Sequence, residues 1–195
     1  MVSGFTRLRA ILWVVVAAVA LSATGLYLFT TNRQTAGFGV GDYALVTADG
    51  NAFSRASFNG HPSALFFGFT HCPEVCPTTL AEMTTWFEQL GEEAGALEAY
   101  FVTVDPERDT AAVIGDYVAW TGAVTGVTGP REEIDKAIKA WAIYAKKIPL
   151  ENGDYTMDHT ASVFLLDRDG NFQGTIAYRE DSKTAVEKLR RLIAG

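Results

Sequence analysis

The apolar positions of the chain form two kinds of pattern, and the first is one long run near the N-terminus. Residues 10–29 carry no charge, and about 20 such residues are enough to cross a bilayer as a helix. Arg7 and Arg9 precede the run, so the positive-inside rule puts the N-terminus in the cytoplasm and the rest of the chain outside it. We expect a cytoplasmic segment over residues 1–9, a transmembrane anchor over 10–29 and a polar tether over 30–39.

A cleaved signal peptide is the alternative interpretation of this run. Ala18-Val19-Ala20 has the small-x-small form of a cleavage site, but apolar residues continue for nine positions beyond it. Either arrangement places the remainder of the chain in an oxidising compartment, and this affects the chemistry expected of its cysteines.

The second pattern covers residues 40–195, where short apolar runs alternate with segments of helical periodicity. Short apolar runs between turn residues predict strands, and apolar residues spaced by three and four predict amphipathic helices. Strands are expected at 43–48, 64–69, 99–104, 124–127, 160–167 and 172–177. Helices are expected from Pro77 through Leu90, over 110–120, from Pro130 to about Tyr144, and around residues 185–193.

This order of elements predicts an α/β fold. Strands that alternate with helices form a partly parallel sheet with both faces covered. The last two strands are joined across Asp169-Gly170, a turn dipeptide, and a helix follows them. A closing antiparallel hairpin and helix is the thioredoxin arrangement, so we expect one thioredoxin-like domain over residues 40–195, preceded by the transmembrane helix.

Composition narrows the possible functions. Hydrophobic residues make up 48% and charged residues 20% of the chain, which is typical of a globular protein. The net charge is −7 and residues 40–195 contain no cluster of Lys or Arg, which argues against a nucleic-acid partner. The two cysteines are four residues apart, a spacing that suits a redox couple or a pair of metal ligands.

Cys72 and Cys76 lie between a predicted buried strand and a predicted helix. If Pro77 is the first helical residue, Cys76 is at or next to the N-cap, where free N–H groups and the helix dipole stabilise a thiolate. Thioredoxin-type redox pairs have two intervening residues, whereas this pair has three. Residues four apart on a helix face the same way, so the two sulfurs could share one metal ion or close a disulfide.

Three histidines could complete a metal site. His61 follows Asn59-Gly60 in a predicted turn and is expected at the surface, and His71 adjoins Cys72, where neighbouring side chains tend to diverge. His159 precedes the strand 160–167, which in a thioredoxin-like sheet runs beside the cysteine-bearing strand, so its imidazole could lie over the thiolates. Two thiolates and one imidazole suit copper. Structural zinc normally takes four protein ligands, and catalytic zinc with two Cys and one His stays possible.

Three blocks of sequence resemble the Sco (SenC) family. They are FTHCPEVCP at residues 69–77, VDPERDT at 104–110 and YTMDHT at 155–160. The order of the blocks matches the family, and the likeness covers roughly residues 40–193. Met157 stands where an aliphatic residue is more common in the family, and it could bring a thioether near the site.

The resemblance implies a thioredoxin-fold metallochaperone that binds Cu(I) or Cu(II) through Cys72, Cys76 and His159. Such proteins assist assembly of the dinuclear copper centre of cytochrome c oxidase, by delivering copper, by reducing that centre's cysteines, or both. The implied partners are the copper-bearing oxidase subunit, other copper chaperones and thiol reductants. Family members are tethered to the bacterial or mitochondrial inner membrane. No transit peptide is evident, so we expect a single-pass protein of the bacterial inner membrane with its body in the periplasm.

Acidic residues near the predicted ligands are candidates for an outer shell. Asp105 could orient a ligand from the second shell of the site, and Asp158 is a similar candidate. The alternative is that Asp105, Arg108 and Asp109 form only a strand end, a turn and a helix cap, and that Asp158 is a loop residue.

Three other functions stay open from the sequence. A thiol–disulfide oxidoreductase would use Cys72 and Cys76 as its catalytic redox pair without metal, and His159 would then be dispensable. A thiol peroxidase suits the fold, but the cysteine spacing differs and no suitable threonine precedes the pair. A copper or redox sensor is compatible with the same residues.

Overall fold

A computed structural model describes residues 3–151 and 153–195, with the backbone alone for residues 3–8, 10 and 28–36. The chain divides into two compact units, with the boundary between Gly37 and Phe38. Residues 1–2, part of the segment predicted to be cytoplasmic, lie outside the described residues.

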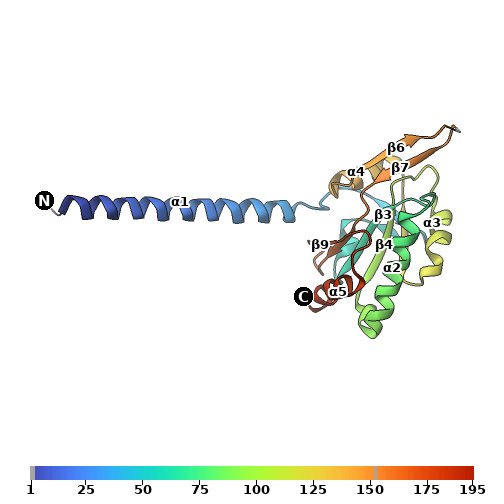
Figure 1. Cartoon of the computed structure of the whole chain (residues 1–195). Helices are drawn as coiled ribbons and strands as arrows, with labels where there is room; N and C mark the ends of the chain where they lie inside the picture. Colours follow the sequence, from blue (N-terminus) through green and yellow to red (C-terminus); the bar gives the residue numbers. More distant parts are fainter. Residues whose placement is uncertain (1–2, 152) are drawn as a thin grey trace. The chain divides into compact units, whose positions relative to one another are not determined.

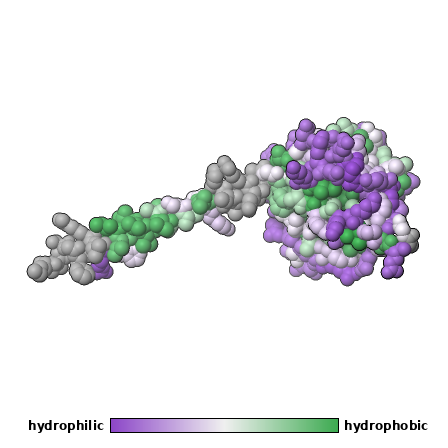
Figure 2. All heavy atoms as spheres, turned by 90° about the horizontal axis from the view of Figure 1, so that it is seen from above, coloured by the Kyte–Doolittle hydropathy of each residue, from purple (hydrophilic) through white to green (hydrophobic). Residues whose placement is uncertain are grey.

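The first unit contains one helix, α1 (Ser3–Ala36). It continues to Ala36, so most of the predicted tether at residues 30–39 is helical. Residues 11–27 are exposed, and Figure 2 shows a hydrophobic surface along this part of the helix. Among the described residues, no helix combines the length and the apolarity needed to cross a membrane. The anchor predicted over residues 10–29 therefore finds no support there and stays a prediction.

The second unit is built on a mixed sheet of seven strands in the order β2-β1-β5-β4-β3-β8-β9. Figure 1 labels β3, β4 and β9 of this sheet. Strands β3, β4 and β5 are parallel, and β8 pairs antiparallel with β3. The strands are β1 (Leu45–Thr47), β2 (Ala52–Phe53), β3 (Ser63–Gly68), β4 (Glu98–Thr103), β5 (Val124–Thr128), β8 (Val163–Leu166) and β9 (Phe172–Ile176). The predicted α/β fold with its closing antiparallel hairpin is confirmed.

Helices cover both faces of this sheet. Along β3, Phe66 packs against Phe101, whereas Phe67 packs against Phe164 on the opposite face, as the alternation of a strand requires. Phe164 also contacts Trp141, which follows α4. The helices are α2 (Val75–Leu90), α3 (Ala111–Val118), α4 (Arg131–Ala140) and α5 (Ser182–Ala194), with short 3-10 helices at Arg55–Phe58, Gly91–Ala96 and Ala119–Thr121.

Two predicted helix boundaries were wrong. Helix α2 begins at Val75 rather than Pro77, so Cys76 is its second residue. Helix α4 ends at Ala140 rather than near Tyr144, because Ala142 adopts a left-handed φ of 50° and the Ile143 N–H bonds back to the Ile138 carbonyl.

A separate two-stranded sheet was not predicted. Strands β6 (Ala145–Pro149) and β7 (Tyr155–His159) form an antiparallel hairpin in the segment that we expected to be a loop. Both strands carry polar residues and are half-buried or exposed, so they lack the apolar alternation that predicts a strand. The chain does contain a turn signal there, the dipeptide Asn152-Gly153.

Candidate metal centre

The structure brings Cys72, Cys76 and His159 together. Their sulfur and nitrogen atoms all lie within 4.8 Å of one another, and the Cys76 Sγ and His159 Nε2 atoms are 3.5 Å apart. Cys72 lies in the loop after β3, Cys76 in the first turn of α2, and His159 at the end of β7. The predicted pairing of the strand after His159 with the cysteine-bearing strand, β8 with β3, explains how the distant imidazole reaches the sulfurs.

The Cys72 sulfur caps the start of α2. The N-cap residue, Glu74, makes no side-chain hydrogen bond to the helix, and the Cys76 N–H instead donates to Cys72 Sγ at 3.3 Å. The first N–H groups of a helix have no partner within it and favour negative charge. This position therefore stabilises a thiolate on Cys72.

The two cysteines differ in both burial and protonation. Cys72 is half-buried, and the hydrogen bond from Cys76, assisted by His159, lowers its pKa to about 4. Cys76 is fully buried, and its pKa is raised because it donates to the neighbouring sulfur and because burial disfavours a second charge. In the metal-free reduced protein, Cys72 is thus the thiolate and Cys76 the thiol.

A backbone carbonyl fixes the tautomer of His159. Its Nδ1 lies 2.9 Å from the Thr160 carbonyl oxygen, which can only accept a hydrogen bond. In the neutral ring Nδ1 therefore carries the proton, and Nε2 presents its lone pair toward the sulfurs. The rings of Phe66 and Phe69 pack against the imidazole, with Phe69 edge-on at 5.7 Å and 89°.

A cleft of about 270 Å³ is lined by Cys72 and His159, but not by Cys76. Met157 and Asp158 both line it, together with the loop that carries Cys72. Asp158 is exposed. The cleft leaves Cys72 and His159 accessible from outside, whereas Cys76 forms part of the core.

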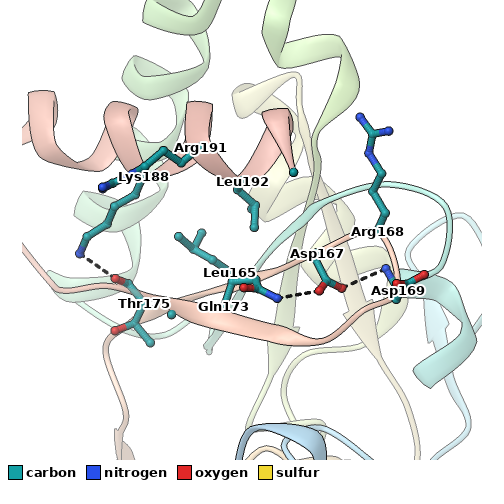
Figure 3. Close-up of a pocket in the computed structure, with 11 residues that line it drawn as sticks. Leu165, Asp167, Arg168, Asp169, Gln173, Thr175, Lys188, Arg191 and Leu192 are labelled. Atoms are coloured by element: carbon teal, nitrogen blue, oxygen red, sulfur yellow. Dashed lines mark hydrogen bonds between the residues drawn. The ribbon is translucent and has the colours of Figure 1, made fainter. Parts of the chain in front are cut away.

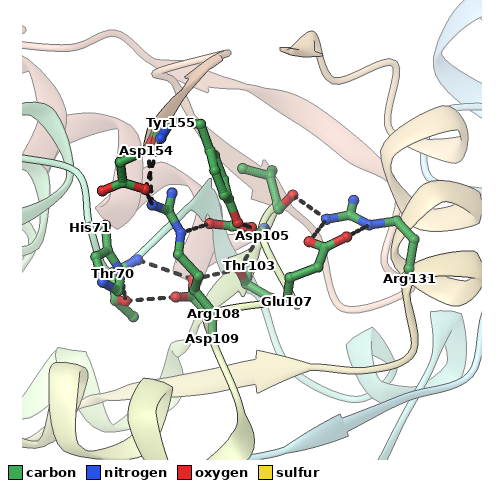
Figure 4. Close-up of polar contacts among 11 residues, drawn as sticks. Thr70, His71, Thr103, Asp105, Glu107, Arg108, Asp109, Arg131, Asp154 and Tyr155 are labelled. Atoms are coloured by element: carbon green, nitrogen blue, oxygen red, sulfur yellow. Dashed lines mark hydrogen bonds and ion pairs between the residues drawn. The ribbon is translucent and has the colours of Figure 1, made fainter. Parts of the chain in front are cut away.

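Asp105 lies in the loop between β4 and α3, and its hydrogen bonds go to the hairpin and to its own loop. Its buried carboxylate accepts from the Arg108 guanidinium and from the Tyr155 hydroxyl at 2.8 Å (Figure 4). Tyr155 is the first residue of β7, the strand that ends at His159. From the sequence we identified Asp105 and Arg108 as candidates but did not predict their contact with Tyr155, because the β6–β7 hairpin was not predicted.

The other two histidines lie apart from this group. His71 is exposed, and its Nδ1 is 3.1 Å from the Thr70 hydroxyl. His61 Nε2 is 4.0 Å from a carboxylate oxygen of Glu98. Both positions agree with the expectation that neither histidine joins the cysteines.

A larger cavity, of about 770 Å³, lies between α5 and the β8–β9 hairpin (Figure 3). The Asp167 carboxylate at its edge accepts hydrogen bonds from the Asn171 amide and the Gln173 side chain. Lys188 donates to the Thr175 carbonyl at 2.9 Å. These polar groups are engaged within the hairpin and helix, and the cavity contains none of the predicted site residues.

Fold and site together define a thioredoxin-like protein with a dithiol and an imidazole gathered where β3 meets α2. The family model of SCO1/SenC matches residues 31–194, and the chain belongs to this family.

Curated and solved relatives agree with this assignment. The mitochondrial SCO2 homolog of Bos taurus is 34% identical over 170 residues, which cover 85% of this chain and 64% of the relative's length. The chain thus spans slightly less than two thirds of that protein. Bradyrhizobium japonicum ScoI, solved with copper bound, is 40% identical with a TM-score of 0.74, covering 80% of this chain and 99% of the other. Yeast Sco1 with copper bound is 30% identical with a TM-score of 0.74, covering 82% and 90%.

Proposed function

We propose that this protein is a copper metallochaperone that holds the ion between Cys72, Cys76 and His159. The observation that carries the proposal is the gathering of two sulfurs and one imidazole nitrogen within 4.8 Å. Sulfur and imidazole are donors that copper prefers over oxygen-rich sites. Two solved members of the family, from Bradyrhizobium japonicum and yeast, hold copper, which supports the same cargo here.

The two accessible ligands provide a route for transfer. A donor or acceptor protein can approach Cys72 and His159 through the cleft, whereas Cys76 stays within the core. Incoming thiolates would bond to the ion while the bonds to His159, to Cys72 and finally to Cys76 break, so copper would move by ligand exchange with no change of oxidation state. We propose the copper-bearing subunit of cytochrome c oxidase as the acceptor, with another copper chaperone as the donor.

Metal loading of the reduced full chain tests the ligand set. We expect one copper ion per chain, and we expect that Cys72→Ser, Cys76→Ser and His159→Ala each weaken binding by more than about 100-fold, the upper end for loss of an outer partner. His71→Ala is the matched control, because this histidine adjoins Cys72 but its Nδ1 lies beside Thr70. Wild-type affinity in the three ligand variants, or an equal loss in His71→Ala, would overturn the assignment.

A thiol–disulfide reductase is the second candidate, favoured by the contrast between the two cysteines. The Cys72 thiolate would attack a partner disulfide, form a mixed disulfide and release one partner thiolate. The Cys76 sulfur, giving up its proton to the departing partner sulfur, would then attack the Cys72 sulfur and displace the second partner thiol. The partner gains two electrons and the protein is left with a Cys72–Cys76 disulfide. Both cysteines are free in the structure. His159→Ala separates the two functions, because thiol exchange should survive it while copper binding should not.

We infer that α1 attaches the body to a membrane, with the body on the periplasmic side of a bacterial inner membrane. The support is the run of exposed apolar side chains from Ile11 to Tyr27, which would be costly to leave in water. Alkaline extraction of membranes from cells expressing the full chain, followed by protease treatment of intact spheroplasts, provides the test. Release at alkaline pH, or a body that resists the protease, would contradict the inference.

A further inference from the structure

One short loop, between β4 and α3, contacts both halves of the site. Its two aspartates, Asp105 and Asp109, are both buried, with 1% and 0% of their surface exposed. A buried carboxylate is stable only where hydrogen bonds or a positive charge compensate it. The partners of each aspartate therefore show what the loop holds in place.

Asp109 holds the loop that carries Cys72. One carboxylate oxygen accepts from the Thr70 N–H at 3.0 Å and from the Thr103 hydroxyl at 2.6 Å, and the other accepts from the Thr70 hydroxyl at 2.6 Å. Thr70 is two residues before Cys72. Hydrogen bonds to a charged acceptor are stronger than neutral ones, so Asp109 fixes the backbone that leads into the dithiol.

Asp105 and Arg108 hold the hairpin that carries His159. Arg108 pairs with Asp105, donates to the Tyr155 carbonyl at 3.0 Å, and lies over the Tyr155 ring with 3.7 Å between the guanidinium carbon and the ring centroid. Figure 4 shows Arg108 between Asp105, Tyr155 and Asp154. A strand rises about 3.3 Å per residue, so this attachment lies about 13 Å along β7 from His159.

The hairpin depends on such attachments. It pairs with no strand of the seven-stranded sheet, and an isolated two-stranded hairpin is only marginally stable in water. The loop itself is braced from the far side, because Arg131 pairs with Glu107, lowers its pKa to about 2, and donates to the Val104 carbonyl at 3.2 Å. Ala145 and Met157 also pack against the core, so the loop and this packing together set the position of the hairpin.

We propose that this loop is a two-sided positioning element, in which Asp109 sets the geometry of the dithiol and the Asp105–Arg108 pair sets the position of the imidazole. The proposal rests on the copper-binding function proposed above. None of the three residues is proposed as a ligand; each acts through another residue, Asp109 through Thr70 and the pair through Tyr155.

Two measurements on the full chain separate the two sides. The dithiol–disulfide equilibrium of the metal-free protein against glutathione reports mainly on the two cysteines, to which His159 adds one hydrogen bond, and copper affinity reports on all three donors. Arg108→Met and Tyr155→Phe should leave the dithiol equilibrium within about twofold, while Arg108→Met weakens copper binding by about 10- to 100-fold, as loss of an outer partner does. Tyr155→Phe removes one hydroxyl and should have a smaller effect in the same direction.

The cysteine side should respond in both measurements. Asp109→Ala should shift the dithiol equilibrium by at least about tenfold, which is close to 30 mV for two electrons. If Asp109→Ala does not fold, Thr70→Val replaces it, with the same expected shift. Glu93→Gln is the control, since it removes a surface ion pair with Arg190 and touches neither the loop nor Thr70 or Tyr155. We expect it to change neither measurement.

Several outcomes would overturn the proposal. Arg108→Met could shift the dithiol equilibrium as strongly as it shifts copper affinity, or Glu93→Gln could reproduce its effect; either would show that the loop acts only through general stability. If the wild-type protein takes up no copper, the proposed function is wrong. Two measurements that need no copper then still test whether the loop positions the dithiol and the hairpin. Amide exchange of β7 should quicken in Arg108→Met but not in Thr70→Val, and the dithiol equilibrium should shift in Thr70→Val but not in Arg108→Met.

Discussion

The cysteine side of the site, Cys72 and Cys76, and the histidine side, His159, are carried by different parts of the fold. Every residue of β3 is buried, its Gly68 backbone lies against the Cys76 sulfur, and Cys76 itself is fully buried. His159 instead ends a two-stranded hairpin that lies outside the central sheet and is half-exposed. The site thus joins one sulfur in the core, that of Cys76, to an imidazole on a peripheral arm, the β6–β7 hairpin, and we expect the arm to be the more mobile side.

The sharpest test of this comparison is the reactivity of the two thiols. In the reduced, metal-free chain we expect iodoacetamide to modify Cys72 at least about 1000-fold faster than Cys76, because Cys72 is a half-exposed thiolate and Cys76 a buried thiol. With the pKa of Cys72 at about 4, its thiolate is fully formed above about pH 6, so its rate should be flat from pH 6 to 8. Digestion and mass spectrometry give the two rates.

The unfolded chain is the control for this measurement. In denaturant both cysteines should react alike, with a rate that falls about tenfold per pH unit below an ordinary thiol pKa of about 8.5. The same tenfold fall for Cys72 in the folded protein would contradict the assignment of the thiolate.

Hydrogen exchange compares the local stability of the β6–β7 hairpin with that of the central sheet. Amides of β6 and β7 should exchange at least about 100-fold faster than those of β3 and β8, because the hairpin can open locally whereas the central strands exchange only when the domain unfolds. Exchange followed by NMR or mass spectrometry on the full chain resolves the two groups. Equal protection of β7 and β3 would mean that the arm is as rigid as the core.

A substitution at Gly68 should show how little room the cysteine side has. A Cβ at this position would lie 2.8 Å from the Cys76 sulfur and 2.5 Å from the Phe101 ring. We expect Gly68→Ala to lower the free energy of unfolding by about 1–3 kcal/mol, the usual effect of overpacking a core. Urea denaturation measures the change, with Gly95→Ala as the control, since a Cβ at Gly95 meets nothing within 4 Å.

The smallest expected effect is at the base of the hairpin. The Thr160 hydroxyl accepts a hydrogen bond from the Tyr144 N–H at 3.0 Å, beside the point where β7 ends. Thr160→Val should ease local opening of the hairpin by about 0.5–1.5 kcal/mol, the usual net value of one hydrogen bond, and leave global unfolding nearly unchanged. Faster exchange confined to β6 and β7 would agree, whereas an equal loss of global stability would show that the hairpin unfolds with the core.

The sequence predicted the cysteine side better than the histidine side, and the reason is physical. Strand β3 is a continuous apolar run followed by a helix with an apolar stripe. Because these residues are buried, their apolar side chains follow the periods of a strand and a helix, and these periods can be recognised in the sequence. The hairpin is held instead by single contacts such as Tyr155 to Asp105, which join residues 50 positions apart. Polar contacts of this kind have no periodicity. The three donors could be named through the spacing of the cysteines, the expected pairing of the strand after His159 with the cysteine-bearing strand, and the likeness to a known family.

The missing side chain at Gly68 has a consequence for how the site adapts to its cargo. With Phe101 and the sheet backbone directly beneath it, the Cys76 sulfur has no space in which to recede. Cu(I) and Cu(II) prefer different coordination geometries, so a change of oxidation state requires some donor to move. That movement would fall to the two donors that line the cleft, Cys72 and His159, so the open side of the site is where the protein would register which form of the ion it carries.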